Sequence, residues 1–284
     1  MNEVPAYLRI NCEVVGKMLT VFLRSEVHKV GFRRAVVGLS GGIDSALTAF
    51  LGARALGPQN VLAVLMPYKT SRPDSLTDAL AVVEQLGLEH RVIDITPQID
   101  AYYANENVPR EEDEERMNLR KGNKMARERM TILYDLSQAI TGLVLGTSNK
   151  TELLLGYGTL YGDMASAINP IGDLYKTQVR QMAQYLGLPE RILKKVPTAD
   201  LWVGQTDEDQ LGFSYLELDQ TLYFLVDQRL RPEEVVALGF EERLVNQVAR
   251  LLQRSQFKRC PPVIAKVSER TINRDFRYSR DWGY

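Results

Sequence analysis

Cysteine is scarce in this sequence: its 284 residues include only Cys12 and Cys260. Neither belongs to a CxxC pair or lies near a second possible metal ligand at a suitable spacing. The sequence therefore predicts neither a disulfide framework nor a zinc site. This cysteine usage is typical of the reducing cytoplasm, where we expect the protein to be located.

An excess of one charge and long apolar runs are also missing. The 35 Lys and Arg residues balance 36 Asp and Glu residues, so no basic field favours nucleic acid or an anionic membrane as a partner. No run approaches the roughly 18 apolar residues of a membrane span. The first residues lack the basic start and apolar run of a secretion signal. We therefore expect a soluble protein.

Short apolar runs alternate with helical patterns over the first two thirds of the chain. Strands are predicted at residues 34–39, 61–66, 91–95 and 143–145, with helical patterns between them. Strands that alternate with helices form a parallel sheet covered on both faces. The predicted fold class is therefore α/β, a doubly wound parallel sheet.

The whole chain, residues 1–284, is predicted to form one domain. Its core covers about residues 30–200, and residues 201–284 add C-terminal helices and a polar, aromatic tail. Helices are predicted at about 175–186, 215–225 and 241–256. No internal repeat or linker separates independent units.

One loop carries the main chemical signal. It follows the first predicted strand, precedes a predicted helix and consists of Gly38, Leu39, Ser40, Gly41, Gly42, Ile43, Asp44 and Ser45. The unpaired N–H groups and the dipole at a helix N-terminus favour an anion such as phosphate. Gly41 and Gly42 permit positive φ and close backbone approach, the serines add hydroxyl donors, and Asp44 can bind Mg²⁺.

Two other interpretations of this loop are disfavoured by its residues. A P-loop needs a lysine directly before the final hydroxyl residue, and Asp44 stands there instead, which disfavours γ-phosphate transfer. A Ser/Gly-rich turn that merely caps a helix would explain a bare SGG, with Asp44 as a first-turn acid. The complete SGGxDS pattern after a buried-looking strand favours pyrophosphate binding.

The loop resembles the PP-loop of ATP pyrophosphatases, which split ATP between the α- and β-phosphates. Further motifs occur in the order seen in NAD synthetases, at residues 145–152, 160–163, 169–171, 176–180 and 197–201. The resemblance extends over about residues 35–260. It implies the adenine nucleotide α-hydrolase-like fold, with an acyl adenylate formed from ATP and a carboxylate.

The resemblance also assigns site residues. Asp44 and Glu152 would bind Mg²⁺, and both follow strands whose carboxyl ends meet at one edge of the sheet. Thr147 would contact the ribose or phosphates of ATP, and Lys176 and Thr198 the phosphates, where an ammonium suits charge developing on pyrophosphate. Taken alone, Glu152 would be a first-turn acid, Thr147 a capping residue and Lys176 a solvated helix residue.

Adenine would lie at residues 65–67, and residues 69–75 and 204–212 are predicted to close over the adenylate and exclude water. In the segment NKMARERM, Arg127 matches the arginine that contacts the deamidated dinucleotide, and Lys258 matches the lysine of a His-Lys pair. Phe257 replaces that histidine. Leu160 and Ala167 replace a lysine and an aspartate that contact the dinucleotide, so neither belongs to the predicted site.

The implied reaction converts nicotinic acid adenine dinucleotide to NAD⁺ with ATP, Mg²⁺ and ammonia, in a homodimer. One alternative is a tRNA-modifying ATP pyrophosphatase, which the missing CxxC and the balanced charge disfavour. Another is a nucleotide sensor, which the retained catalytic residues disfavour. Because glutamine hydrolysis needs a cysteine nucleophile with a base, the lone cysteines favour free ammonia, although a separate glutaminase could supply it.

Overall fold

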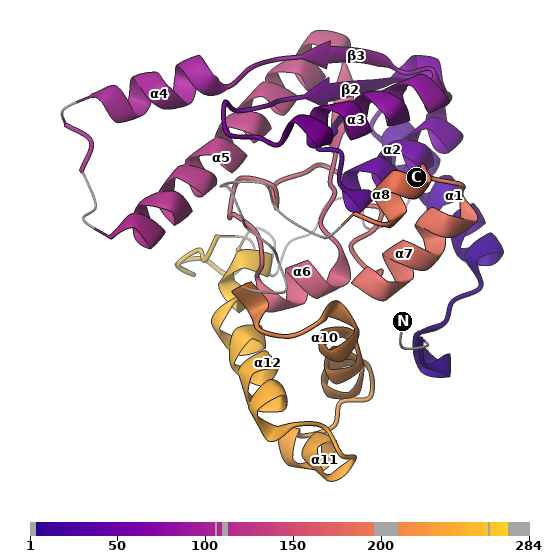
Figure 1. Cartoon of the computed structure of the whole chain (residues 1–284), viewed down its shortest axis with the longest axis vertical. Helices are drawn as coiled ribbons and strands as arrows, with labels where there is room; N and C mark the ends of the chain where they lie inside the picture. The colour runs from indigo at the N-terminus through magenta and orange to yellow at the C-terminus, as the bar shows by residue number, and fades with distance from the viewer. Residues whose placement is uncertain (1–3, 106, 110–112, 196–209, 261, 272–284) are drawn as a thin grey trace.

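The sheet lies in the upper part of the computed structural model as Figure 1 shows it. The structure describes residues 4–105, 107–109, 113–195, 210–260 and 262–271. Within these residues the sheet has four strands: β1 (Arg34–Gly38), β2 (Val61–Leu65), β3 (Glu89–Val92) and β4 (Gly142–Leu145). All pair in parallel, in the order β3-β2-β1-β4. The predicted parallel α/β fold is confirmed.

Three of the four predicted strands match the observed ones to within one residue, and β3 does not. It begins two residues before the predicted run and ends before the apolar residues that suggested it. As the edge strand it is exposed at all four positions, so it lacks an apolar pattern. Ile93 and Ile95 follow it. Their N–H groups donate to the carbonyls of Leu65, the last residue of β2, and of Pro67, and Ile95 is fully buried.

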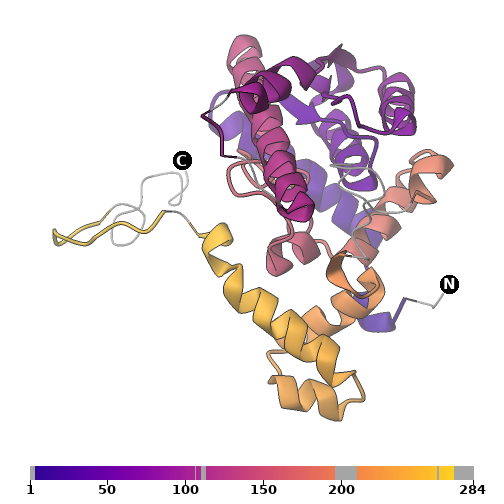
Figure 2. The ribbon, with the colours of Figure 1, turned by 60° about the vertical axis from the view of Figure 1, so that its left-hand side comes forward.

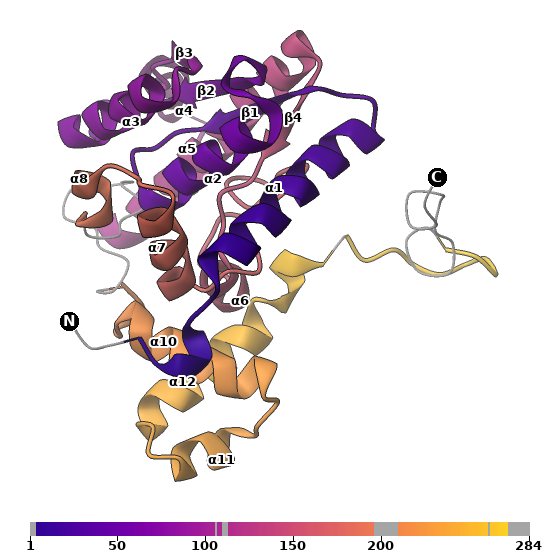
Figure 3. The same ribbon diagram turned by 90° about the vertical axis from the view of Figure 1, so that its right-hand side faces the viewer.

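Helices cover both faces of the sheet because successive residues of a strand point to opposite sides. Val37 of β1 joins one core cluster with α1 (Cys12–Lys29), α2 (Ile43–Leu56), α3 (Pro73–Leu86) and α7 (Lys176–Tyr185). Its neighbour Val36 joins a second cluster, with α4 and α5. Helix α4 spans Thr96–Ala104 and α5 spans Glu114–Ile140. Figure 3 shows α1 and α2 in front of the sheet and α5 behind it.

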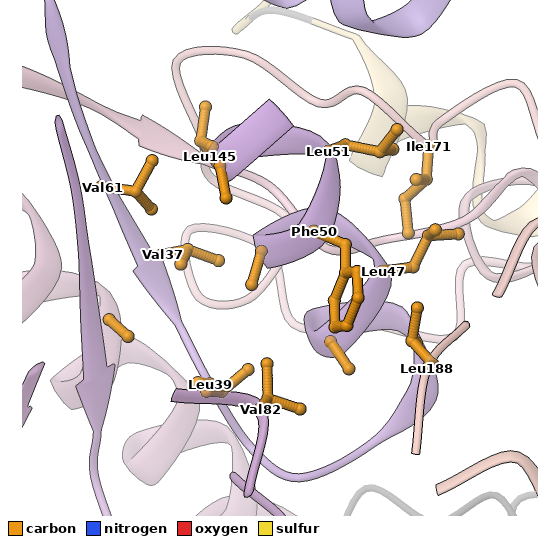
Figure 4. Close-up of a cluster of buried hydrophobic side chains, with 14 of the residues drawn as sticks. Val37, Leu39, Leu47, Phe50, Leu51, Val61, Val82, Leu145, Ile171 and Leu188 are labelled. Carbon is orange, nitrogen blue, oxygen red and sulfur yellow. The ribbon is translucent and has the colours of Figure 1, made fainter. Parts of the chain in front are cut away.

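Helix α2, which carries the end of the Ser/Gly loop, is held rigidly in the first core cluster. Eleven of its 14 residues are buried. Leu47, Phe50 and Leu51 pack with Val37 and Leu145 of the sheet (Figure 4). Each fully buried side chain of this size stabilises the fold by about 1.5–3 kcal/mol. This packing therefore holds the N-terminus of α2 in a fixed position on the sheet.

The remaining helices extend the molecule beyond the sheet. They are α6 (Lys150–Leu155), α8 (Glu190–Leu193), α10 (Tyr215–Leu222), α11 (Pro232–Ala237) and α12 (Glu242–Arg254). Helices α10 and α12 pack on α6 around a third apolar cluster, which includes Leu8 from the N-terminal segment (Figure 1). Both predicted C-terminal helices are confirmed, although α10 continues only as a π-helical turn, Tyr223–Asp227.

Residues 262–271 extend away from the helices, as Figure 2 shows. In the described part of the chain, no helix is both long enough and apolar enough to cross a membrane.

Candidate active site

The Ser/Gly loop connects β1 to α2, as predicted. Gly41 has φ of +75°, a conformation that side chains other than glycine's rarely adopt. A Cβ atom there would lie 2.2 Å from the backbone oxygen of Ser75 in α3. Gly42 has φ of −90° and caps α2, so it does not use the positive φ that glycine permits. Only Gly41 makes the sharp reversal, and its close approach to α3 leaves no room for a side chain.

The two hydroxyl groups of the loop fold it on itself. The Oγ atoms of Ser40 and Ser45 lie 3.0 Å apart, and Ser45 Oγ donates to the carbonyl of Gly42 at 3.0 Å. The backbone N–H of Ser40 donates to Ser45 Oγ at 3.2 Å. These bonds preorganise the loop around the start of α2, where helix N–H groups have no partner within the helix.

Asp44, Glu152 and Lys176 come together beside this loop. The ammonium of Lys176 lies 2.5 Å from Asp44 Oδ2 and 3.2 Å from Glu152 Oε1. Lys176 is only 2% exposed, so it is not a solvated helix residue. Because two carboxylates face one ammonium, the cluster carries an excess negative charge and attracts further positive charge.

Asn149 is a residue of this cluster that the sequence analysis missed. It is fully buried and donates from Nδ2 to Asp44 Oδ1 at 2.9 Å. It also caps α6, where its side chain and that of Glu152 form a reciprocal capping box. Glu152 is therefore a first-turn acid, as its position alone suggested, and also a partner of Lys176.

The position of Lys176 is fixed from beneath by a buried hydrogen-bond chain. Its backbone N–H donates to Thr151 Oγ1 at 3.0 Å, and this hydroxyl donates to Asp219 Oδ1 at 2.5 Å. Asp219 Oδ2 accepts from the N–H of Thr177 at 2.8 Å. Burial raises the pKa of Asp219 to about 6, although the hydrogen bonds from Thr151 and Thr177 oppose the shift. Asp219 thus anchors the start of α7 from α10.

A cavity of about 600 Å³ opens at the carboxyl ends of the strands and contains this cluster. Its lining includes most of the predicted ATP residues: Gly38, Leu39, Ser40, Gly42, Ile43, Asp44, Ser45, Thr147, Glu152 and Lys176. Gly41 is missing from the lining because it packs against α3. Thr198 lies outside the described residues.

The structure describes the predicted adenine site and the first predicted lid, but only the end of the second predicted lid. Residues 65–67, at the end of β2, line the cavity where adenine is expected. Of the first predicted lid, Ser71, Arg72, Pro73 and Ser75 line the cavity, and α3 begins within it. The second lid falls largely outside the described residues, with Gln210 contributing to the lining.

Known proteins match this arrangement. A family model described as NAD synthase matches residues 15–262. The chain belongs to the NAD synthase family. It is 58% identical to the NH(3)-dependent NAD(+) synthetase of Trichlorobacter lovleyi, over 97% of this chain and 98% of that one.

Two solved structures extend the comparison. An NMN synthetase from Francisella tularensis gives a TM-score of 0.79 at 32% identity, covering 90% of this chain and 99% of that chain. An NH3-dependent NAD synthetase from Campylobacter jejuni, in complex with the nitrate ion, gives 0.75 at 37% identity, covering 90% and 100%. These structures of similar proteins therefore share the overall fold of this chain over most of its length.

Of the two predicted acceptor residues, Lys258 lines the cavity and Arg127 does not. Lys258 lines it and donates to the carbonyl groups of Gly156 and Gly158, each at 2.8 Å. Burial lowers the pKa of Lys258, and the positive charge of Arg127 adds to the effect. Arg127 itself donates from Nε to the carbonyl of Leu160 at 3.2 Å. The two cations thus lie near each other around residues 156–160.

Two positions that depart from the family pattern are exposed. Ala167 and Phe257 both lie at the surface, and Phe257 is 62% exposed. Leu160 contributes its carbonyl oxygen to Arg127, a contact that any residue type can make.

Proposed function

We propose that this protein converts nicotinic acid adenine dinucleotide to NAD⁺, using ATP and ammonia and releasing AMP and pyrophosphate. The observation that carries the proposal is the Asp44–Lys176–Glu152 cluster beside the Ser/Gly loop, in one cavity. The likeness to proteins named NH(3)-dependent NAD(+) synthetase over nearly their whole length supports the choice of reaction.

The chemistry has two steps. An oxygen of the nicotinate carboxylate attacks the α-phosphorus of ATP, so that a C–O–P linkage forms and the bond to the β-phosphate breaks. Ammonia then attacks the acyl carbon, loses a proton, and AMP leaves with the carboxylate oxygen. Neither step needs a covalent enzyme intermediate, so positioning and charge neutralisation dominate.

The loop and Lys176 supply these two effects. The preorganised loop offers backbone N–H groups at the start of α2 to phosphate oxygens. The ammonium of Lys176, held rigidly through Thr151 and Asp219, neutralises charge on the departing pyrophosphate without first having to be immobilised. Thr147 and Thr198 are proposed as further ATP contacts.

Asp44 and Glu152 fit the role of Mg²⁺ ligands. Within the described residues, no three His, Cys, Asp or Glu side chains form a set that could hold a metal ion without help. Mg²⁺ is commonly bound by one or two carboxylates together with substrate phosphates, which matches two carboxylates beside a phosphate loop. The bound ion would neutralise phosphate charge.

Arg127 and Lys258 are proposed to bind the acid dinucleotide. One of the similar structures, with a TM-score of 0.79, is named an NMN synthetase, and its name indicates a mononucleotide acceptor, which is smaller than a dinucleotide. Nicotinic acid mononucleotide is therefore the second acceptor to test.

Free ammonia is the proposed nitrogen donor. Cys12 and Cys260 are both free thiols. Burial raises the pKa of Cys12, which makes it a poorer nucleophile. Cys260 is exposed, and neither thiol lines the cavity, so neither is placed to hydrolyse glutamine there.

We also propose a cytoplasmic homodimer built from single-domain subunits. Helix α1 presents an exposed apolar face formed by Val14, Met18, Val21 and Phe22, which are 41–64% exposed. A contiguous apolar face of this kind is typical of a protein–protein contact, and a second copy of the chain is the proposed partner. Sedimentation of the purified protein tests this part.

Acceptor-dependent release of AMP tests the function. The purified protein is given ATP, Mg²⁺ and ammonium with the acid dinucleotide, with the acid mononucleotide, with tRNA, or with no acceptor. AMP and pyrophosphate are expected only with the acid dinucleotide, in amounts equal to the NAD⁺ formed. Release that needs tRNA would contradict the proposal, and release with the mononucleotide alone would change the substrate. Equal turnover with glutamine in ammonia-free buffer would overturn the nitrogen source.

A further inference from the structure

A second lysine, Lys195, lines the same cavity as the Ser/Gly loop but is held by different elements from those that hold Lys176. It follows α8, and its side chain is 12% exposed. Its ammonium lies 2.7 Å from Asp78 Oδ2 and 3.2 Å from Ser75 Oγ, both in α3. Figure 3 shows α8 close to α7 and below α3. These two contacts hold the ammonium of Lys195 against α3.

The anchor of Lys195 touches the loop directly. A Cβ atom on Gly41 would lie 2.2 Å from the carbonyl oxygen of Ser75 and 3.1 Å from Cβ of Asp78. The turn of α3 that binds the ammonium is therefore the turn on which the loop rests. Ser75 and Lys195 line the same cavity as the loop, so they face the same space as a phosphate bound there.

The charges around the loop are unequal. On the α3 side, Asp78 is almost buried and faces two cations, because Arg191 Nε also lies 2.5 Å from its Oδ1. Asp74 and Arg72, which pair with each other at 3.0 Å, add one charge of each sign, so this side keeps an excess positive charge. The Asp44–Lys176–Glu152 cluster has an excess negative charge, so the negative charge of a phosphate group is favoured on the α3 side.

We propose that Lys195 binds the terminal phosphates of ATP and retains pyrophosphate after it has separated from the α-phosphate. The inference rests on the proposed function and assigns a second lysine to it. Lys176 neutralises charge where the bond breaks, and Lys195 takes the far end of the leaving group, with Asp78 as the positioning residue.

Direct binding of pyrophosphate tests this role without any acceptor. Titration calorimetry with Mg²⁺-pyrophosphate and, separately, with AMP is carried out on the unmodified protein, Lys195→Ala, Lys195→Arg and Lys194→Ala. Lys194 is a matched control, because it carries the same charge one residue away on a side chain that is 75% exposed. Lys195→Ala is expected to weaken pyrophosphate binding at least about ten-fold and AMP binding less than about two-fold.

The control variants separate position from charge. Lys195→Arg should retain most of the affinity, and Lys194→Ala should change it less than about two-fold, because an exposed charge is screened by solvent. Equal pyrophosphate affinity in Lys195→Ala would overturn the inference, as would equal losses for pyrophosphate and AMP, which would indicate a structural effect. Equal weakening by Lys194→Ala would also overturn it. If the unmodified protein failed to bind pyrophosphate, the proposed function itself would be wrong.

Discussion

Replacing Gly41 with alanine should destabilise the protein even when no ATP is present. The φ of +75° is a left-handed conformation, which costs an alanine about 1–2 kcal/mol. The new Cβ would also lie 2.2 Å from a backbone oxygen of α3, so either the loop or the helix must move. Because about 1 kcal/mol lowers the melting temperature of a chain of this size by roughly 2–4 °C, a loss of about 4 °C or more is expected.

Gly42→Ala is the matched control for this prediction. Gly42 has φ of −90°, which alanine adopts readily, and an added Cβ would meet nothing closer than Ser40 Oγ at 3.3 Å. Its melting temperature should stay within about 2 °C of the unmodified protein, since less than about 1 kcal/mol is at stake. Scanning calorimetry without nucleotide measures both variants. Equal losses in the two variants, or no loss in Gly41→Ala, would refute the argument that only Gly41 makes the sharp turn.

Three further substitutions test the cluster beside the loop. Asp44→Asn keeps the shape of the side chain and loses its charge, so the Mg²⁺ concentration that gives half-maximal AMP release should rise at least about ten-fold; an unchanged Mg²⁺ dependence would contradict its role as a ligand. Lys176→Ala should lower kcat about 10²–10³-fold in single-turnover adenylation and leave the KM of the acceptor unchanged; the reverse pattern would place Lys176 in the acceptor site. Asp219→Asn tests the buried anchor through pH. Because burial raises the pKa of Asp219 from 3.8 to about 6, the folded protein binds a proton there more readily than the unfolded chain, and ionisation costs stability as the pH rises through this interval. Between about pH 4 and about pH 7, urea unfolding should show the unmodified protein losing up to about 3 kcal/mol relative to Asp219→Asn; a constant difference would show that Asp219 does not titrate in this range.

The strands and the loop could be predicted from the sequence because their signals are local. A β-branched run ending in glycines predicts β1, and the SGGxDS pattern predicts an anion site at the start of α2. The edge strand β3 was misplaced because its exposed residues carry no apolar pattern. Which of the two adjacent glycines has positive φ could not be predicted, because they look alike in a sequence and only the contact with α3 distinguishes them.

The residues that support the site were harder to find, since their partners are distant in the chain. The position of Asn149 at the start of α6 could have been predicted, because Asn149 and Glu152 have the spacing of a capping box. The contacts of Asp219 and Lys195 could not be predicted from the sequence. Asp219 lies 68 residues from Thr151 in the chain, and Lys195 lies 117 residues from Asp78. Only the packing of α10 on α6, and of α8 near α3, brings these pairs together.

Transfer of an isotopic label tests most directly whether the chain forms an amide through an adenylate. The acid dinucleotide is prepared with ¹⁸O in its nicotinate carboxylate and incubated with the protein, ATP, Mg²⁺ and ammonium, and the products are examined by mass spectrometry. Because the carboxylate oxygen that attacks the α-phosphorus leaves with AMP, one ¹⁸O should appear in each AMP for each NAD⁺ formed. Formation of ADP with the label in inorganic phosphate, or of unlabelled AMP, would contradict the proposed reaction.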